Sequence, residues 1–214
     1  DSEAEADDRY FDILKRSIIT YLTFYPQDEM RNKMQQGWLK AEVDKSQKLT
    51  QLGVWIQEEI KFKTENEHIR KLRQTRISLA QELKKYDIVL AEALAINKIL
   101  SKSGKSNEAR EFAYVAAYEY YRAKDFKNAL PLFIPLTELE ENTLIDKYAL
   151  QAQNLVLDIY NQEQRYAEIV KQSDKWLRNT AFLNNKLYKN DIKEMGLIRS
   201  QAEFESTAAL GENK

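Results

Sequence analysis

Few side chains in this sequence could do metal chemistry. The 214-residue chain has one histidine, His68, and no cysteine, so thiolate sites and cysteine nucleophiles are excluded. Glu65 stands three residues before His68, a spacing that puts two side chains on one face of a helix. Zinc needs three or four ligands, and no second histidine supports this pair. We therefore interpret His68 as a helix surface residue and expect no metal site.

The carboxylate pairs are equally poor candidates for acid–base chemistry. Glu58 is next to Glu59, and Glu140 is next to Glu141. Neighbouring residues diverge by about 100° on a helix, so neither pair could hold one proton or one substrate between its two members. No glycine-rich phosphate loop or glycine-flanked serine accompanies them. We expect a protein that is not an enzyme and that uses no cofactor.

Three arginines form the clearest cationic feature. Arg70, Arg73 and Arg76 follow one another at steps of three, which makes a ridge on one helix face. Such a ridge could bind phosphate, nucleic acid or an acidic protein tail. Glutamates are interleaved with basic residues in this stretch, so a solvated face with internal salt bridges is the competing interpretation. The net charge is −1, and a nucleic-acid partner is therefore not expected.

Three tyrosines form the clearest candidate for binding another protein. Tyr114, Tyr118 and Tyr121 recur at steps of four and three, with Arg122 beside them. Tyrosine and arginine are enriched at protein interfaces, where rigid rings supply contact area. The alternative is that these rings pack on a neighbouring helix or are simply exposed.

The composition predicts that helices carry all of these residues. Only five glycines and three prolines are present, so the chain lacks the residues that tight hairpins require. Hydrophobic residues make up 43% of the chain, which is enough for a folded core. No stretch approaches the ~20 apolar residues of a membrane helix, so no membrane insertion is expected.

A repeat organises these helices. The segments 85–90, 125–130 and 165–170 share one pattern, and their aromatic residues Tyr86, Phe126 and Tyr166 are 40 residues apart. Apolar residues also recur six and nine positions before each aromatic residue. Leu49 and Phe11 fit the same slot at upstream spacings of 37 and 38. Each unit is predicted as a helix, a short turn just before the aromatic residue and a second helix, and we expect the aromatic residue to be a buried anchor.

The units resemble divergent tetratricopeptide repeats. In the best unit, from about 110 to 141, the residues that carry the resemblance are Ala117, Tyr120, Phe126, Ala129 and Phe133. The spacing of 37 to 40 residues exceeds the ~34 of standard repeats. The resemblance implies an all-α fold, a right-handed superhelical solenoid of antiparallel helix hairpins.

The resemblance also implies where a partner would bind. In tetratricopeptide arrays the first helices line a concave groove, and the residues twelve, eight and five before the second-helix aromatic residue face into it. In the unit of Phe126 these are the three tyrosines, with Arg122 beside them. In the unit of Tyr166 they are Asn154, Asp158 and Asn161.

The two ends carry further expectations. Residues 1–8 are acidic and are predicted to be a flexible N-terminus, followed by a single solenoid over 9–214. Residues 9–26 resemble a second helix without its first, and residues 190–210 resemble a first helix without its second. We expect a segment of a longer repeat array whose exposed ends favour end-to-end self-association.

These observations favour a non-enzymatic scaffold or adaptor that binds a protein or peptide in its groove. Two alternatives stay open, an accessory helical domain of a larger enzyme and an anion-binding module that uses Arg70, Arg73 and Arg76. The sequence has a bacterial character, but it does not distinguish cytoplasm from periplasm.

Overall fold

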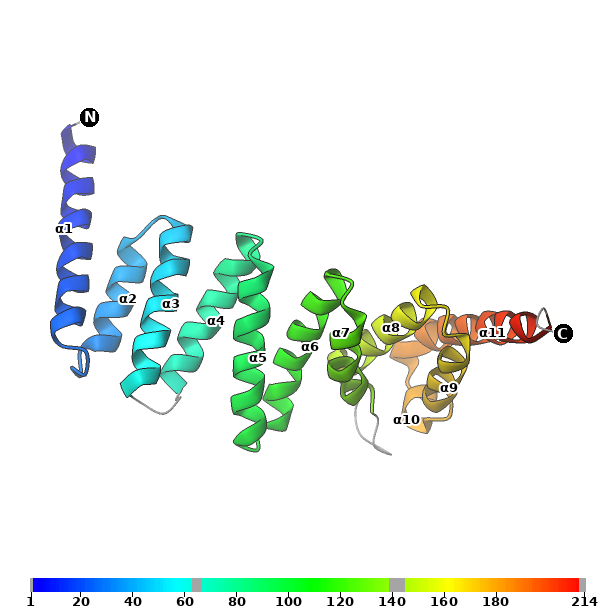
Figure 1. Ribbon diagram of the computed structural model, residues 1–214. Coiled ribbons are helices and arrows are strands. Elements are labelled where there is room, and N and C mark those ends of the chain that lie inside the picture. Colours follow the sequence, from blue (N-terminus) through cyan, green and yellow to red (C-terminus); the bar gives the residue numbers. More distant parts are fainter. Residues whose placement is uncertain (1, 63–66, 139–144, 212–214) are drawn as a thin grey trace. The chain divides into compact units, whose positions relative to one another are not determined.

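A computed structural model describes residues 2–62, 67–138 and 145–211 of the chain. Within these residues the protein is all-α, with helices joined by turns and loops and no β-strand. The predicted fold class is thus confirmed at the level of helix content. The helices follow one another along the chain, and neighbours in the sequence such as α1 and α2, α3 and α4, and α6 and α7 pack together (Figure 1).

The helices are α1 (Ser2–Phe24), α2 (Arg31–Ala41), α3 (Lys45–Phe62), α4 (Glu67–Glu82), α5 (Tyr86–Lys102), α6 (Ser106–Arg122), α7 (Phe126–Phe133), the 3₁₀ helix η1 (Ile134–Thr137), α8 (Lys147–Gln162), α9 (Tyr166–Leu177), α10 (Thr180–Leu183), the 3₁₀ helix η2 (Lys186–Tyr188) and α11 (Lys189–Gly211).

The contacts divide the chain into two compact units, residues 1–99 and 100–214. The boundary falls in the last turn of α5. The expectation of one continuous solenoid over 9–214, and its handedness, stays a prediction.

The first unit is held by an apolar core shared by four helices. Leu22 of α1, Trp38 of α2, Trp55 of α3 and Ile69 of α4 are all buried in it. The rings of Trp38 and Trp55 meet edge to face, with centroids 5.4 Å apart. Large buried rings of this kind contribute much of the stability of a helical core.

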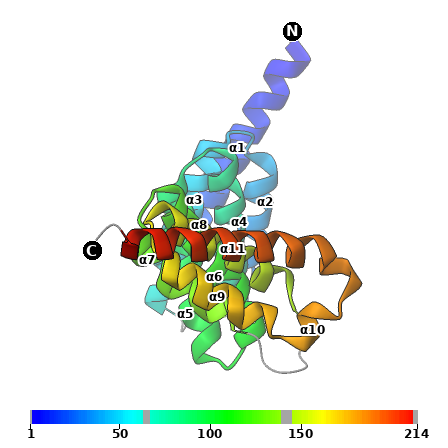
Figure 2. The ribbon, with the colours of Figure 1, turned by 90° about the vertical axis from the view of Figure 1, so that its right-hand side faces the viewer.

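The second unit has its own core, to which helices from α6 to α11 contribute. Ala117 of α6, Phe133 of α7, Val156 of α8, Trp176 of α9 and Met195 of α11 are buried there. Helix α11 packs against α9, and Figure 2 shows α11 from the side, lying across the view next to α9.

The same turn joins the helices of three successive hairpins. Helices α5, α7 and α9 each begin on the repeated aromatic residue, as predicted. Two residues earlier, Lys84, Lys124 and Gln164 have φ values of 56°, 58° and 56°. In each turn the next N–H bonds back to a carbonyl five residues earlier, as from Asp125 to Tyr120 at 2.9 Å. This is the Schellman ending of a helix, and it recurs with the 40-residue period of the sequence.

The aromatic anchors are less buried than expected. Tyr86, Phe126 and Tyr166 are each half-buried, because they are the first residues of their helices and lie beside the turn. The residues three positions later carry the core contacts instead: Ala129, for example, has no exposed surface. The prediction that Phe126 is a buried anchor was therefore wrong in degree.

The upstream units depart from the pattern. Leu49 is buried, but it lies inside α3 rather than at its start, and Phe11 lies in the middle of α1 and is exposed. Helix α1 begins at Ser2, so the acidic residues 2–8 are helical here, and their flexibility stays a prediction.

Candidate partner-binding groove

A row of aromatic rings follows one side of α6. Tyr114 stacks on Tyr118 with centroids 6.1 Å apart, and Tyr118 stacks on Tyr121 at 6.2 Å. The row continues from Tyr121 to Phe126, at 6.0 Å, and from Tyr114 to Tyr148 of α8, at 5.6 Å. Steps of three and four residues on one helix bring these rings together, as the sequence predicted.

The three tyrosines differ in exposure. Tyr118 is 39% exposed, whereas Tyr114 and Tyr121 are half-buried. Tyr114 packs edge to face against the fully buried Phe133, and burial raises the pKa of its phenol. Tyr114 therefore belongs in part to the core, as the competing interpretation proposed, and Tyr118 offers the most accessible ring.

Tyr121 connects the aromatic row to the next predicted groove position. Its hydroxyl donates a hydrogen bond of 2.6 Å to Oδ2 of Asp158 on α8. Gln162, one turn later on α8, donates to the same oxygen at 2.6 Å. The bond to Asp158 raises the pKa of Tyr121 to about 12, because the carboxylate stabilises the neutral phenol.

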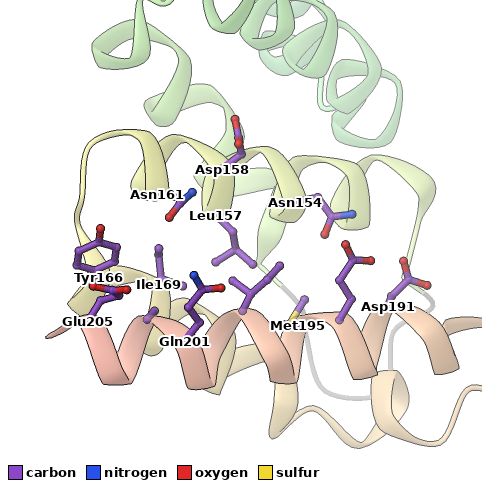
Figure 3. Close-up of a pocket in the computed structure, with 13 residues that line it drawn as sticks. Asn154, Leu157, Asp158, Asn161, Tyr166, Ile169, Asp191, Met195, Gln201 and Glu205 are labelled. Carbon is purple, nitrogen blue, oxygen red and sulfur yellow. The ribbon is translucent and has the colours of Figure 1, made fainter. Parts of the chain in front are cut away.

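A pocket opens between α8, α9 and α11 (Figure 3). Its volume is about 310 Å³, and the predicted groove residues Asn154, Asp158 and Asn161 line it. The two asparagines are exposed and can offer amide groups to a ligand. The remaining lining is Leu157 of α8, Tyr166 and Ile169 of α9, and Asp191, Glu194, Met195, Ile198, Gln201, Ala202 and Glu205 of α11.

Apolar side chains lie between two charged ends of this pocket. Figure 3 shows Leu157, Ile169 and Met195 in the middle, with Asp191 at one end and Glu205 beside Tyr166 at the other. Leu157, Ile169 and Met195 are themselves buried, so they supply a fixed apolar floor. The lining holds four carboxylates, and no lysine, arginine or histidine lines it within the described residues.

Arg122, the one cation predicted in the groove, lies outside this pocket. Its Nη1 donates to Oε2 of Glu119, one turn earlier on α6, at 3.2 Å. Glu119 is buried, and this desolvation raises the pKa of its carboxyl although Arg122 opposes the shift. The groove near the pocket is therefore acidic rather than mixed.

The three arginines of the ridge on α4 all form ion pairs. Arg70 pairs with Glu67, while Arg73 and Arg76 both pair with Glu92 of α5. Arg73 and Glu92 are both buried.

A glycine makes room for one of these arginines. Arg76 also donates to the carbonyl oxygen of Leu49 at 3.3 Å, and it lies over Gly53 of α3, where an added Cβ would come within 2.7 Å of its guanidinium. The structure therefore resembles the salt-bridged alternative more than a free anion-binding ridge.

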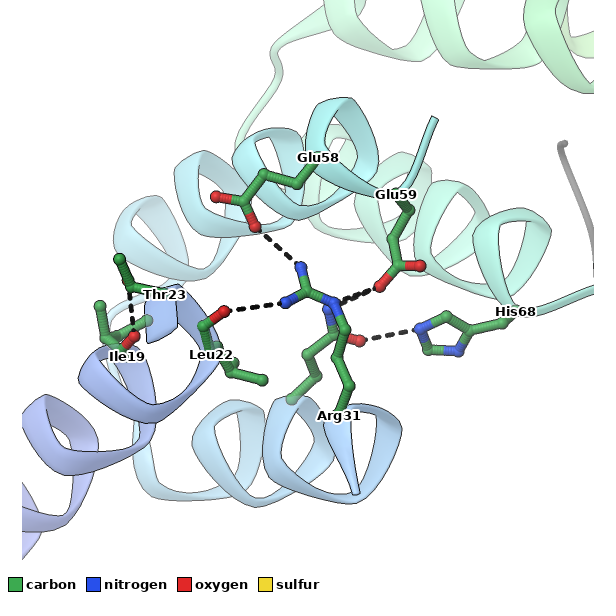
Figure 4. A network of polar contacts seen from close by, with 8 residues as sticks. Ile19, Leu22, Thr23, Arg31, Glu58, Glu59 and His68 are labelled. Atoms are coloured by element: carbon green, nitrogen blue, oxygen red, sulfur yellow. Dashed lines mark hydrogen bonds and ion pairs between the residues drawn. The ribbon is translucent and has the colours of Figure 1, made fainter. Parts of the chain in front are cut away.

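The lone histidine belongs to a polar network between the first four helices (Figure 4). His68 of α4 shares a 2.8 Å hydrogen bond with Oε1 of Gln35 on α2. Arg31, which is 1% exposed, bonds to Glu58 at 2.8 Å, to Glu59 and to the carbonyl oxygen of Leu22 at 3.3 Å. His68 is half-buried and structural, rather than the surface residue that we expected.

A metal site at His68 would need acidic partners close to its ring. Its suggested partner Glu65 lies outside the described residues, and within those residues no group of three His, Cys, Asp or Glu side chains could hold a metal ion. None of the described helices is long and apolar enough to span a bilayer.

The contribution of α11 to the pocket was not predicted from the sequence. The groove positions of a unit were counted back from its second-helix aromatic residue, and α11 has no such residue after it. A signal was nevertheless present, because Asp191, Met195, Ile198, Ala202 and Glu205 recur at steps of three and four. That stripe is one helix face, and it is the face that lines the pocket.

Comparisons of this chain with protein-family models, with curated proteins and with solved structures find no match.

Proposed function

We propose that this chain is a non-enzymatic scaffold or adaptor of tetratricopeptide-like hairpins, and that it binds a protein or peptide along α6, α8 and α11. The observation that supports this proposal most is the pocket lined by Asn154, Asp158 and Asn161. The resemblance to tetratricopeptide repeats implies that these residues are groove positions, and all three line one concave feature.

The aromatic row adds a second surface beside the first. Tyr121 bonds directly to Asp158, so the exposed ring of Tyr118 is connected to the pocket wall through a short chain of contacts. A partner that lies across α6 and α8 would meet rings, amides and an apolar pocket in succession. This combination of an aromatic anchor, a concave apolar site and a polar rim is typical of peptide recognition.

A selection from a random displayed peptide library tests this proposal. Wild-type protein is the bait, and the double variant Asn154→Ala/Asn161→Ala is the counter-bait, since both amides are exposed and their loss should leave the fold intact. We expect a peptide consensus that enriches on the wild type and not on the variant. Enrichment that is equal on both baits, or no enrichment, would contradict the proposed groove.

A matched control separates groove effects from general surface effects. Asn97 on α5 and Asn128 on α7 also lie outside the pocket, but they are on other helices, and Asn128 is bonded to the N-cap Asp125. The control is therefore Gln151→Ala, which removes an exposed amide from α8 itself, outside the pocket. This variant should select the same peptides as the wild type.

A further inference from the structure

The carboxylates of the pocket differ from several acidic residues of the same unit that are paired with arginine. Asp146 pairs with Arg110 at 2.8 Å, and Asp174 pairs with Arg199 at 2.5 Å. Asp191, Glu194 and Glu205 form no ion pair with any residue that the structure describes. Unbalanced negative charge is therefore gathered around one apolar pocket.

The apolar floor shows that this is more than a cluster of acids. Buried Leu157, Ile169 and Met195 lie between the charged ends, and the volume of about 310 Å³ is at the lower end of the ~300–1,000 Å³ of ligand pockets. A small hydrated cation would not cover the apolar part of the lining, which includes the partly exposed Tyr166 and Ile198. A ligand with both cationic and apolar parts would cover the floor and neutralise the rim.

We propose that the pocket binds a basic peptide segment, with lysine or arginine side chains at its charged ends and apolar side chains on its floor. The inference rests on the proposed groove function and specifies the chemistry of the partner. Charge complementarity carries it: four carboxylates and no lining cation favour a cationic partner and repel an acidic one. The exposed amides of Asn154 and Gln201 can bond to the peptide backbone.

The geometry of α11 sets the spacing of the basic residues. Asp191 and Glu205 are 14 residues apart on this helix, which corresponds to about 21 Å at 1.5 Å per residue. An extended peptide advances about 3.3 Å per residue, so about six residues cover this length. Alternate side chains of an extended peptide face the same way, so a basic residue, two apolar residues and a second basic residue would all face the pocket.

The probe that matches this spacing is the heptapeptide Lys-Ala-Leu-Ala-Leu-Ala-Lys, blocked at both ends and labelled with a fluorophore. Two comparison peptides have glutamate in place of both lysines or serine in place of both leucines. Binding to the full chain is followed by fluorescence anisotropy. We expect the lysine–leucine peptide to bind at least about tenfold more tightly than either comparison peptide, because only it satisfies both the rim and the floor.

Variants of the protein locate the binding. Asp191→Asn/Glu194→Gln and Glu205→Gln should each weaken the lysine–leucine peptide by about tenfold. The matched control is Glu203→Gln, which removes a charge from the same helix two residues from Glu205 and outside the pocket. It should change the affinity less than about twofold. Thermal unfolding of each variant shows whether its fold is intact.

The outcomes separate this inference from the proposed function. Equal loss of affinity in Glu203→Gln and Glu205→Gln would mean that the peptide responds to the overall negative charge of the protein and not to the pocket. This result would overturn the inference. Binding of the glutamate peptide, or of the free polyamine spermidine in place of any peptide, would overturn the basic-peptide occupant. If the library still yields a consensus that depends on Asn154 and Asn161 but lacks basic residues, the groove stands and only its inferred chemistry fails.

Discussion

The hydroxyl of Tyr121 connects two helices through a single hydrogen bond, and this bond makes stability depend on pH. The bond to Asp158 raises the pKa of Tyr121 from 10.0 to about 12. In the folded state the phenol keeps its proton to a higher pH than in the unfolded state. The resulting stabilisation is complete below pH 10 and is lost as the pH rises through about 12.

This predicts a specific effect of Tyr121→Phe. Between about pH 10 and about pH 12, wild-type protein should lose more free energy of unfolding than the variant, because the variant lacks the perturbed group. Urea unfolding followed by circular dichroism at each pH measures the difference. Tyr118→Phe, which removes an exposed phenol from the same row, should follow the wild type. Parallel curves for the wild type and Tyr121→Phe would contradict the role of the bond.

Two phenylalanines of α7 test how the repeat contributes to stability. Phe133 has no exposed surface, whereas Phe126 is half-buried beside the turn. Phe133→Ala should lower the free energy of unfolding by about 3–5 kcal/mol, as large truncations in cores do. Phe126→Ala should cost about half of this or less, because its ring keeps part of its surface in water. Urea unfolding of the two variants gives the comparison, and a larger loss for Phe126→Ala would contradict the burial seen here.

At the scale of elements, the recurring helix ends are strained. Lys84, Lys124 and Gln164 adopt positive φ values that favour glycine, and at the equivalent turn after α5 the residue with φ 74° is Gly104. A side chain in this region of φ costs about 1–2 kcal/mol relative to the right-handed helix. The chain tolerates this cost three times because the Schellman bonds satisfy the last carbonyls of each helix.

We therefore expect Lys124→Gly to raise the free energy of unfolding by about 0.5–1 kcal/mol. The strain is relieved, and the greater freedom of glycine in the unfolded chain offsets only part of the gain. The matched control is Ala123→Gly, one residue earlier, where φ is −76° and glycine should destabilise by about the same amount. Thermal and urea unfolding measure both variants, and a loss of stability for Lys124→Gly would show that the turn is not strained.

Element by element, the sequence predicts local structure better than it predicts the site. The 40-residue period located the turns before Tyr86, Phe126 and Tyr166, because local pattern and turn chemistry determine where a helix breaks. It could not reveal that Arg31 is buried, since its partners Glu58 and Glu59 lie 27 and 28 residues away and an isolated arginine in a sequence looks like a surface residue.

The same limit applies to the groove. Asn154, Asp158 and Asn161 could be chosen because the resemblance to tetratricopeptide repeats implies which positions of a unit face the groove. The opposite wall, with Asp191 and Glu205, could not, because pairing it with α8 requires the packing of α11 on α9. Helix faces can be predicted from periodicity, whereas which faces meet depends on tertiary packing.

At the scale of the whole molecule, both terminal helices expose large apolar side chains. On α1, Tyr10 is 62% exposed and Ile13 is 66% exposed. On α11, Leu197 is 63% exposed and Phe204 is 70% exposed, and the two stand seven residues apart on one helix face. Exposed apolar stripes of this kind favour contact with another apolar surface.

The predicted end-to-end self-association can therefore be tested on named side chains. We expect sedimentation velocity to show a sedimentation coefficient that rises with protein concentration for the wild type, because association removes these stripes from water. The double variant Leu197→Gln/Phe204→Gln should sediment as a monomer across the same concentrations while keeping its melting temperature, since neither side chain contributes to the core. Glu203→Gln, an exposed change on a different face of the same helix, is the control and should associate as the wild type does. A wild type that remains monomeric at every concentration would show that the exposed stripe on α11 does not drive association of this chain with itself.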